Sequence, residues 1–289
     1  MPQNILLIGS EGYIGASLAH PLLSNYSIDT CDILPSKMHR EFHFQRNYGE
    51  LTKIEISKYE FIILLAAHSS VSACIKNPSE AVENNIVNFM RLLTNMNSDQ
   101  TLIYASSGSV YDGYMNSFPQ ENAKILSSRN IYDFTKISND LMASTFQIPT
   151  VGLRFGTLSG YSPIMREDLI INKMTKDALD YKIITVSNAS AFRSCLGMQD
   201  LCNAIITLIN QRSKILEPTA VFNLASFSKS IEQISGEIAK KMGAERKYIG
   251  DSPTYNFSMS VEKFERIFNF QFVDTIEKIV DGLIYNIAN

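Results

Sequence analysis

Three of the fourteen glycines in this 289-residue chain lie close together, at Gly9, Gly12 and Gly15. They follow a short apolar run at 4–9 and open an amphipathic stretch at 13–23. The first glycine permits a tight turn, the second lets the backbone approach a pyrophosphate, and the third lets helix and strand pack closely. The phosphates would lie at the helix N-terminus, where N–H groups and the helix dipole favour an anion. The spacing therefore predicts a dinucleotide-binding loop.

An acidic residue at the expected distance supports this interpretation. Asp32 ends a second predicted strand, at 28–33, and stands 17 residues beyond Gly15. A carboxylate in this place binds both ribose hydroxyls of NAD and repels the 2′-phosphate of NADP. Lys37 and Arg40 follow within a few residues and leave NADP as an alternative. NAD is the favoured cofactor.

The first half of the chain alternates short apolar runs with longer amphipathic ones. Strands that alternate with helices predict βαβ units and an α/β fold, a Rossmann-type, doubly wound parallel sheet. Strands are expected at 4–9, 28–33, 61–67, 101–106 and 150–155, and helices at 13–23, 79–96 and 131–146.

Beyond residue 156 the pattern becomes mostly helical. Helices are expected at 168–181, 200–211, 231–242, 261–268 and 275–287, with strand candidates at 182–186 and 219–224. We therefore expect an NAD-binding Rossmann domain at 1–156 and a small, mostly helical substrate-binding lobe at 157–289. A late strand of this lobe is expected to return to the main sheet.

Composition excludes several classes of protein. Apolar residues make up 45% of the chain, charged residues 19%, and the net charge is −3, which fits a globular protein without a bulk attraction to nucleic acid or membranes. Neither a signal peptide nor an apolar run of membrane-spanning length is expected. The cysteines (Cys31, Cys74, Cys195 and Cys202) form no CxxC pair, so no metal site is expected and the predicted location is cytoplasmic.

The glycine spacing GxxGxxG, in place of GxGxxG, is typical of short-chain dehydrogenases/reductases. The chain resembles their extended branch, the NAD-dependent epimerase/dehydratase family that modifies nucleotide sugars. The segments that carry the resemblance are LAAHSSV at 65–71, NP at 77–78 with Asn84, and YASSGSVY at 104–111. The resemblance implies a homodimer formed through the helices at 79–96 and 131–146. It assigns the cofactor to Gly9, Gly12, Tyr13, Ile14, Gly15, Asp32, Ile33, Leu65, Ala66, Ala67, His68, Asn84, Tyr132, Lys136 and Phe155.

A tyrosine and a lysine stand four residues apart, at Tyr132 and Lys136, so they lie on one face of the predicted helix. A tyrosine with its ordinary pKa near 10 is a poor base, and a nearby ammonium lowers that pKa. Tyr132 is therefore the expected acid–base group for a sugar hydroxyl. Ser107, 25 residues earlier at a strand end, is expected to hydrogen-bond the same oxygen and stabilise its developing charge. These three residues form the predicted catalytic triad.

The neighbours of Ser107 narrow the chemistry. The family's 4,6-dehydratases carry an acid pair directly after the catalytic hydroxyl residue, and here Gly108 and Ser109 occupy those positions. The 3,5-epimerases need a cysteine and a histidine, and Ser109 replaces the cysteine. C4-type epimerisation through a keto sugar is therefore favoured, with one-way dehydrogenase or 4-keto reductase activity as the alternative. A non-catalytic nucleotide sensor is a second alternative, disfavoured because the Tyr–Lys pair is retained.

Substrate residues follow from the resemblance alone. It implies that Ser109, Asn172, Arg193 and, more weakly, Arg166 contact the substrate, with Asn172 and Arg193 near its diphosphate. Four positions depart from the family pattern: Asn47, Asp112, Thr157 and Gly197. The identity of the sugar and of the nucleotide stays open.

Overall fold

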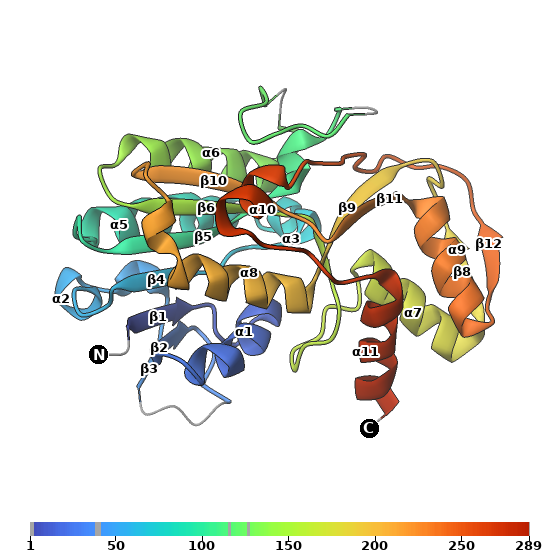
Figure 1. Ribbon diagram of the computed structural model, residues 1–289, viewed down its shortest axis with the longest axis horizontal. Coiled ribbons are helices and arrows are strands. Elements are labelled where there is room, and N and C mark those ends of the chain that lie inside the picture. Colours follow the sequence, from blue (N-terminus) through green and yellow to red (C-terminus); the bar gives the residue numbers. More distant parts are fainter. Residues whose placement is uncertain (1–2, 38–41, 115–116, 126–127, 289) are drawn as a thin grey trace. The chain divides into compact units, whose positions relative to one another are not determined.

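The computed structural model describes residues 3–37, 42–114, 117–125 and 128–288 (Figure 1). Contacts divide the chain into two compact units, and each unit is discontinuous in sequence. Unit 1 comprises Met1–Val110, Ser127–Arg154 and Leu208–Phe222, and unit 2 comprises Tyr111–Leu126, Phe155–Thr207 and Asn223–Asn289. The expected boundary lay after residue 156, with later segments returning to the main sheet. By contacts, one boundary lies after Arg154, the segment 208–222 belongs to unit 1, and the segment 111–126 belongs to unit 2.

Unit 1 is built on a seven-stranded sheet with the order β10-β6-β5-β4-β1-β2-β3. Its strands are β1 (Asn4–Ile8), β2 (Ser27–Asp32), β3 (His43–Gln45), β4 (Phe61–Leu64), β5 (Thr101–Ser107), β6 (Thr150–Phe155) and β10 (Thr219–Leu224). The pairs from β3 through β2, β1 and β4 to β5 are parallel. The order of the first six strands, 3-2-1-4-5-6, is that of the Rossmann fold, which confirms the predicted fold class. The short edge strand β3 was not predicted.

The late strand predicted at 219–224 does return to this sheet, as β10 beside β6. The central strands β1 and β4 are almost continuously buried, as expected of parallel strands covered on both faces. Successive strands are added in one direction from β1 to β3 and in the other direction from β4 onward. In sheets of this kind ligands bind at the carboxyl ends of the two strands where the order switches, here β1 and β4.

The helices of unit 1 are α1 (Tyr13–Leu23), α2 (Lys53–Ile56), α3 (Val71–Lys76), α4 (Pro78–Val82), α5 (Asn88–Asn95) and α6 (Ile131–Thr145). The helix predicted at 79–96 is correct in extent but is interrupted by a π-helical turn at Glu83–Val87. Such turns are frequent at functional sites. Here the turn carries Asn84 and Asn85, and it packs with α3 and α4 against α6.

Unit 2 contains two small sheets and several helices. The sheets have the orders β11-β9-β7 and β12-β8. The strands are β7 (Thr157–Ser159), β8 (Ile183–Val186), β9 (Phe192–Gly197), β11 (Phe227–Ser230) and β12 (Glu245–Tyr248). The helices are α7 (Ile170–Tyr181), α8 (Met198–Asn210), α9 (Ile231–Met242), α10 (Glu262–Phe268) and α11 (Ile276–Ala288). Of these strands only β8 was predicted.

The core of unit 2 lies among α7, α9 and α11, whose apolar faces meet β8 and β9. The capping box of Ser230 and Gln233 starts α9, and Gly243, at φ 60°, ends it. No helix in the described part of the chain has the length and hydropathy needed to span a bilayer.

Candidate active site

The glycine loop joins β1 to α1, and its first and third glycines are required by packing. A Cβ atom on Gly9 would lie 2.5 Å from the Ala66 backbone nitrogen, and one on Gly15 would lie 2.0 Å from the Gly9 carbonyl oxygen. Gly9 also has φ 88°, which favours glycine. Gly12 differs, because a Cβ there would meet nothing closer than 3.5 Å. The protein's own packing therefore leaves space beside Gly12, at the uncapped N-terminus of α1, as a bound pyrophosphate requires.

Asp32 ends β2 and is tied to this loop. Its Oδ2 accepts the Glu11 backbone N–H at 3.0 Å, and its Oδ1 accepts that of Leu34, also at 3.0 Å. Glu11 itself was not predicted, although it is buried in the loop and its carboxylate accepts the Lys37 N–H at 3.1 Å. Two carboxylates at the end of β2 and in the glycine loop fit NAD, since both would repel a 2′-phosphate. Lys37 and Arg40 left NADP as an alternative cofactor, and Arg40 lies outside the described residues.

The predicted segment after β4 lies against the glycine loop. The Leu65 and Ala66 N–H groups both donate to the Ile8 carbonyl at the end of β1, at 2.8 and 3.2 Å. Ala67 and His68 continue this segment and are half-buried. Ile33, in contrast, is 67% exposed. The structure therefore gathers the predicted glycines, Asp32 and residues 65–68 in unit 1, whereas Phe155, the buried last residue of β6, belongs to unit 2.

Asn85, which was not predicted, connects this segment to α6. Its Oδ1 accepts the His68 N–H at 2.8 Å, and its Nδ2 donates to the His68 carbonyl and to Thr135 Oγ1, both at 3.2 Å. The predicted Asn84 instead pairs with Asn47, whose Nδ2 lies 3.3 Å from the Asn84 Oδ1. The paired asparagines of the π-helical turn thus have different partners, and a sequence pattern could not tell which faces α6.

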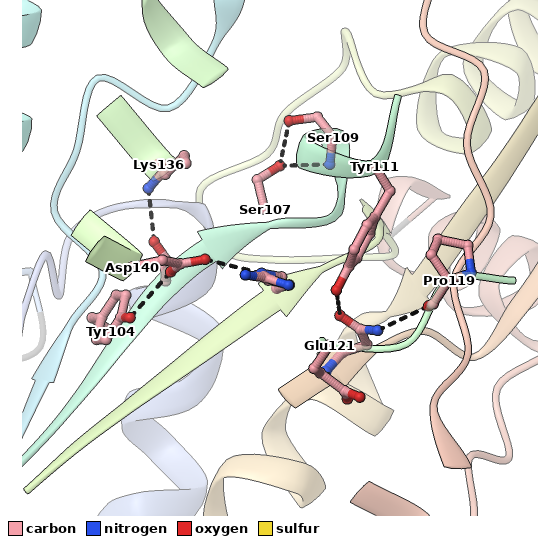
Figure 2. Close-up of polar contacts among 11 residues, drawn as sticks. Tyr104, Ser107, Ser109, Tyr111, Pro119, Glu121, Lys136 and Asp140 are labelled. Atoms are coloured by element: carbon pink, nitrogen blue, oxygen red, sulfur yellow. Dashed lines mark hydrogen bonds and ion pairs between the residues drawn. The ribbon is translucent and has the colours of Figure 1, made fainter. Parts of the chain in front are cut away.

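The three predicted catalytic residues all lie in unit 1, on β5 and α6. Asn130 caps α6 by accepting the Asp133 N–H, and one turn of helix then separates Tyr132 from Lys136. The Lys136 ammonium lies 5.8 Å from the centre of the Tyr132 ring. It donates to the Ala105 carbonyl at 2.8 Å, on the strand that carries Ser107 (Figure 2). Lys136 is 4% exposed and Tyr132 is half-buried. The triad is thus on neighbouring elements of one sheet–helix layer.

Ser107 is joined to two further polar groups. Its Oγ lies 2.9 Å from Ser109 Oγ and accepts the Ser109 backbone N–H at 3.2 Å (Figure 2). Ser109 Oγ donates to Asp133 Oδ1 at 2.7 Å. All three side chains are buried. Asp133 was not predicted, although its place directly after Tyr132 was visible in the sequence.

The predicted substrate residues of unit 2 form two separate groups. Asn172 closes the loop before α7, since its Oδ1 accepts the Gly160 N–H and its Nδ2 donates to the Arg166 carbonyl, each at 2.9 Å. The Arg166 guanidinium pairs with Asp168 at 2.6 Å. Arg193, on β9, is 7% exposed and donates to the Phe192 carbonyl at 2.9 Å and to Thr254 Oγ1 at 2.5 Å. Thr254 was not predicted.

Besides Asn47, which contacts Asn84, two further sequence departures have partners in the structure. A Cβ on Gly197 would lie 2.0 Å from Asp274 Oδ2, so the Asp274 carboxylate occupies the space of the missing side chain. Asp112 Oδ1 accepts the Asn256 N–H at 2.7 Å, which ties it to the segment that holds Arg193. Among the described residues, no group of three His, Cys, Asp or Glu side chains could hold a metal ion.

Comparison with known proteins identifies the family. The sequence profile of the NAD dependent epimerase/dehydratase family matches residues 5–225. The chain belongs to this family. Protein CapI from Staphylococcus aureus is 33% identical over 235 residues, which cover 72% of this chain and 70% of CapI. The UDP-glucose 4-epimerase of Mycoplasma genitalium is 25% identical over 278 residues, covering 82% and 81% of the two chains.

Solved structures of this epimerase/dehydratase fold superpose on the whole chain. The UDP-glucuronic acid 4-epimerase from Bacillus cereus, in complex with UDP-glucuronic acid and NAD, matches with a TM-score of 0.86 at 20% identity, over 99% of both chains. MoeE5, in complex with UDP-glucuronic acid and NAD, matches with a TM-score of 0.85 at 18% identity, also over 99% of both. At these identities the likeness concerns the fold.

The pKa of Lys136 predicts a pH dependence for the candidate site. Burial lowers the pKa of Lys136 to about 8, against the opposing effects of Asp140 and Cys74. We expect kcat to fall as the pH rises through about 8, because the ammonium that stabilises a Tyr132 phenolate loses its proton. The folded pKa lies below the ordinary value of 10.5, so the unfolded chain binds more protons between these values. The contribution of Lys136 to the free energy of unfolding therefore rises with pH over the same range.

Activity and stability should thus change in opposite directions. The test measures kcat and urea unfolding on the same samples in steps from pH 7 upward. A kcat that stays level well above pH 8 would contradict the assignment of a charged Lys136 to the reaction. A parallel loss of both quantities would indicate unfolding instead.

Proposed function

We propose that the protein is an NAD-dependent epimerase that inverts one carbinol, of the C4 type, in a nucleotide-activated sugar. The arrangement of Ser107, Tyr132 and Lys136 in the unit that carries the dinucleotide loop supports this proposal most directly. NAD, when bound, supplies the chemistry of accepting a hydride from the sugar carbon and returning it to the opposite face of the keto sugar. The relatives that bear the name UDP-glucose 4-epimerase or UDP-glucuronate 4-epimerase favour the same reaction.

Each residue has a distinct task in this proposal. Tyr132 removes the proton of the sugar hydroxyl and later returns it to the keto oxygen. Lys136, held by the Ala105 carbonyl, keeps a positive charge near the phenol and lowers the cost of the phenolate. Ser107 hydrogen-bonds the reacting oxygen.

The cofactor would be held by the groups that surround the glycine loop. The pyrophosphate would lie beside Gly12, and Asp32 would accept the ribose hydroxyls. Residues 65–68 would line the cofactor position at the carboxyl ends of β1 and β4. In unit 2, the buried guanidinium of Arg193 uses only part of its five donors on Phe192 and Thr254, so it can also bind a diphosphate. Asn172 is the second proposed substrate contact.

Dehydration has less support. Gly108 carries no side chain, and the Ser109 hydroxyl donates its hydrogen bond to Asp133. Neither position therefore supplies the carboxyl group that the family's dehydratases use as acid or base to eliminate water.

The test incubates the purified protein with UDP-, GDP-, CDP- and dTDP-hexoses and follows the sugar protons by NMR. The expected result is an epimer of unchanged mass, no net NADH, and NAD that stays with the protein through purification. If NAD must be added and NADH forms in proportion to product, the protein is a one-way dehydrogenase and not an epimerase. Consumption of NADH with a 4-keto sugar would indicate a reductase. NAD bound without turnover of any sugar would leave the nucleotide-sensing alternative.

A homodimer through the helices at 79–96 and 131–146, which include α5 and α6, is part of the proposal. Met90 on α5 and Phe134 and Leu141 on α6 are 44%, 48% and 62% exposed. Apolar side chains grouped on two packed helices are suited to a second copy of the same face. Light scattering of the purified protein would reveal a monomer if this expectation is wrong.

A further inference from the structure

A buried carboxylate lies behind Ser107, at the end of a chain of hydroxyl groups. The contacts run from Ser107 Oγ to Ser109 Oγ at 2.9 Å and from Ser109 Oγ to Asp133 Oδ1 at 2.7 Å. Ser107 and Ser109 are each 7% exposed and Asp133 is 2% exposed. These hydrogen bonds therefore connect Ser107 to the carboxylate of Asp133, which is almost inaccessible to solvent.

The number of hydrogens available fixes the direction of this hydrogen-bond chain. A carboxylate only accepts hydrogen bonds, so the single hydroxyl hydrogen of Ser109 points to Asp133. Ser109 Oγ then has no hydrogen left for Ser107, and the hydrogen between the two serines must belong to Ser107. Ser107 also accepts the Ser109 N–H at 3.2 Å. In this arrangement Ser107 has no hydrogen to donate to a substrate oxygen and can only accept one.

Asp133 also has a structural task, which any test must separate from the chain. It is the third residue of α6, where its N–H donates to Asn130 Oδ1 and its Oδ2 accepts from Asn130 Nδ2, each at 3.0 Å. A carboxylate in the first helical turn is favoured by the helix dipole. Capping by itself, however, needs no bond to Ser109.

We propose that Asp133 is the terminal proton acceptor of a second proton route that runs from the sugar hydroxyl through Ser107 and Ser109. The inference rests on the proposed function. As the carbinol is oxidised, its hydroxyl proton moves to Ser107 Oγ, the Ser107 hydrogen moves to Ser109 Oγ, and the Ser109 hydrogen moves to Asp133 Oδ1. Three O–H bonds break and three form, and the carboxylate becomes a carboxylic acid.

The transfer reverses every hydrogen bond in the chain. The protonated Asp133 donates to Ser109, Ser109 donates to Ser107, and Ser107 donates to the keto oxygen. The same serine therefore accepts from the alcohol and donates to the ketone, as each of the two oxidation states requires. Reduction on the other face returns the proton along the same path, so the cycle leaves Asp133 ionised again.

The kinetic test uses the Tyr132→Phe background, in which the phenol route is absent. NADH absorbance is followed in a single turnover after the protein is mixed with the nucleotide sugar that the NMR test selects. Addition of Asp133→Asn or of Ser109→Ala is expected to slow the remaining rate at least tenfold, about 1.4 kcal/mol per factor of ten. Ser106→Ala is the matched control, because Ser106 is buried in the same segment and its Oγ is outside the chain. It should leave the rate unchanged.

Equal rates in all four proteins would overturn the proposal, as would a loss of thermal stability in Asp133→Asn without a loss of rate. Ser109→Ala keeps the test decisive if Asp133→Asn fails to fold, since Ser109 lies outside the cap of α6. A wild-type protein that converts no sugar refutes the proposed function and not the hydrogen-bond direction.

A second measurement needs no turnover. Neutron diffraction from the deuterium-exchanged, NAD-bound protein is expected to place the Ser107 deuterium toward Ser109 and the Ser109 deuterium toward Asp133. If the deuterium atoms point the opposite way in this sugar-free protein, Ser107 cannot accept the proton of the sugar hydroxyl, and the proposed proton route is excluded. Infrared spectra provide a further signature, since oxidation of the sugar should produce a carboxylic-acid band that Asp133→Asn removes.

Discussion

Replacement of Tyr132 by phenylalanine is expected to lower kcat by about 10²–10⁴-fold, the usual contribution of one acid–base group. The ring and its packing are retained, and only the oxygen that exchanges the substrate proton is lost. NAD affinity, measured by calorimetry, should change little, because the glycine loop and Asp32 are untouched. The residual rate would be the part that the Ser107–Ser109–Asp133 chain carries.

Tyr181→Phe is the matched control for this variant, since that tyrosine is 70% exposed on α7. It should retain full activity. If Tyr132→Phe turned over the sugar at the wild-type rate while binding NAD, the predicted triad would be wrong.

The largest effect on stability is expected from a buried ion pair beneath α6. Arg154 Nε donates to Asp140 Oδ2 at 2.9 Å, and the Tyr104 hydroxyl donates to Asp140 Oδ1 at 3.1 Å (Figure 2). Both charged side chains are 6% exposed. Asp140→Asn removes the buried carboxylate that faces the Arg154 guanidinium, and we expect a loss of about 3–5 kcal/mol in the free energy of unfolding. Urea denaturation measures this loss.

Two controls separate the charge from the packing. The double variant Asp140→Leu/Arg154→Met removes both charges and should regain much of the lost stability, because a buried ion pair gains little over apolar side chains. Glu83→Gln breaks the exposed pair with Arg91 and should cost at most about 1 kcal/mol. A small effect of Asp140→Asn would mean that Arg154 reaches solvent after the change.

The ion pair also affects the site. The Asp140 carboxylate raises the pKa of Lys136 against the lowering by burial. Asp140→Asn should therefore move the alkaline decline of kcat to lower pH, provided that the variant is assayed where it is folded.

Sequence patterns predicted the elements that repeat a regular period. The limits of α1, β6, α9 and β10 agree with the predicted ranges 13–23, 150–155, 231–242 and 219–224. The two helices have apolar residues at helical spacing, and the two strands are rich in β-branched and aromatic residues. These patterns sufficed for the fold class.

The elements that were missed lack such a period. The strand β9, with the sequence FRSCLG, mixes a buried arginine with small residues, and β12, ERKY, is exposed along its whole length. The π-helical turn at Glu83–Val87 was missed because one extra residue in a helical turn leaves the apolar spacing almost unchanged.

By itself the sequence determined the Rossmann-type order of strands and helices, the glycine loop after β1 and the Tyr132–Lys136 pair on one helix face, because each shows in residues a few positions apart. Only the tertiary structure decided which buried polar groups contact these elements. Asp133 reaches Ser109 across 24 positions, and Arg154 reaches Asp140 across 14. Hydrogen bonds and ion pairs of this kind have no fixed spacing in a sequence, since their partners meet only when β5, β6 and α6 have packed. The hydrogen-bond direction at Ser107 is accordingly a property of the fold.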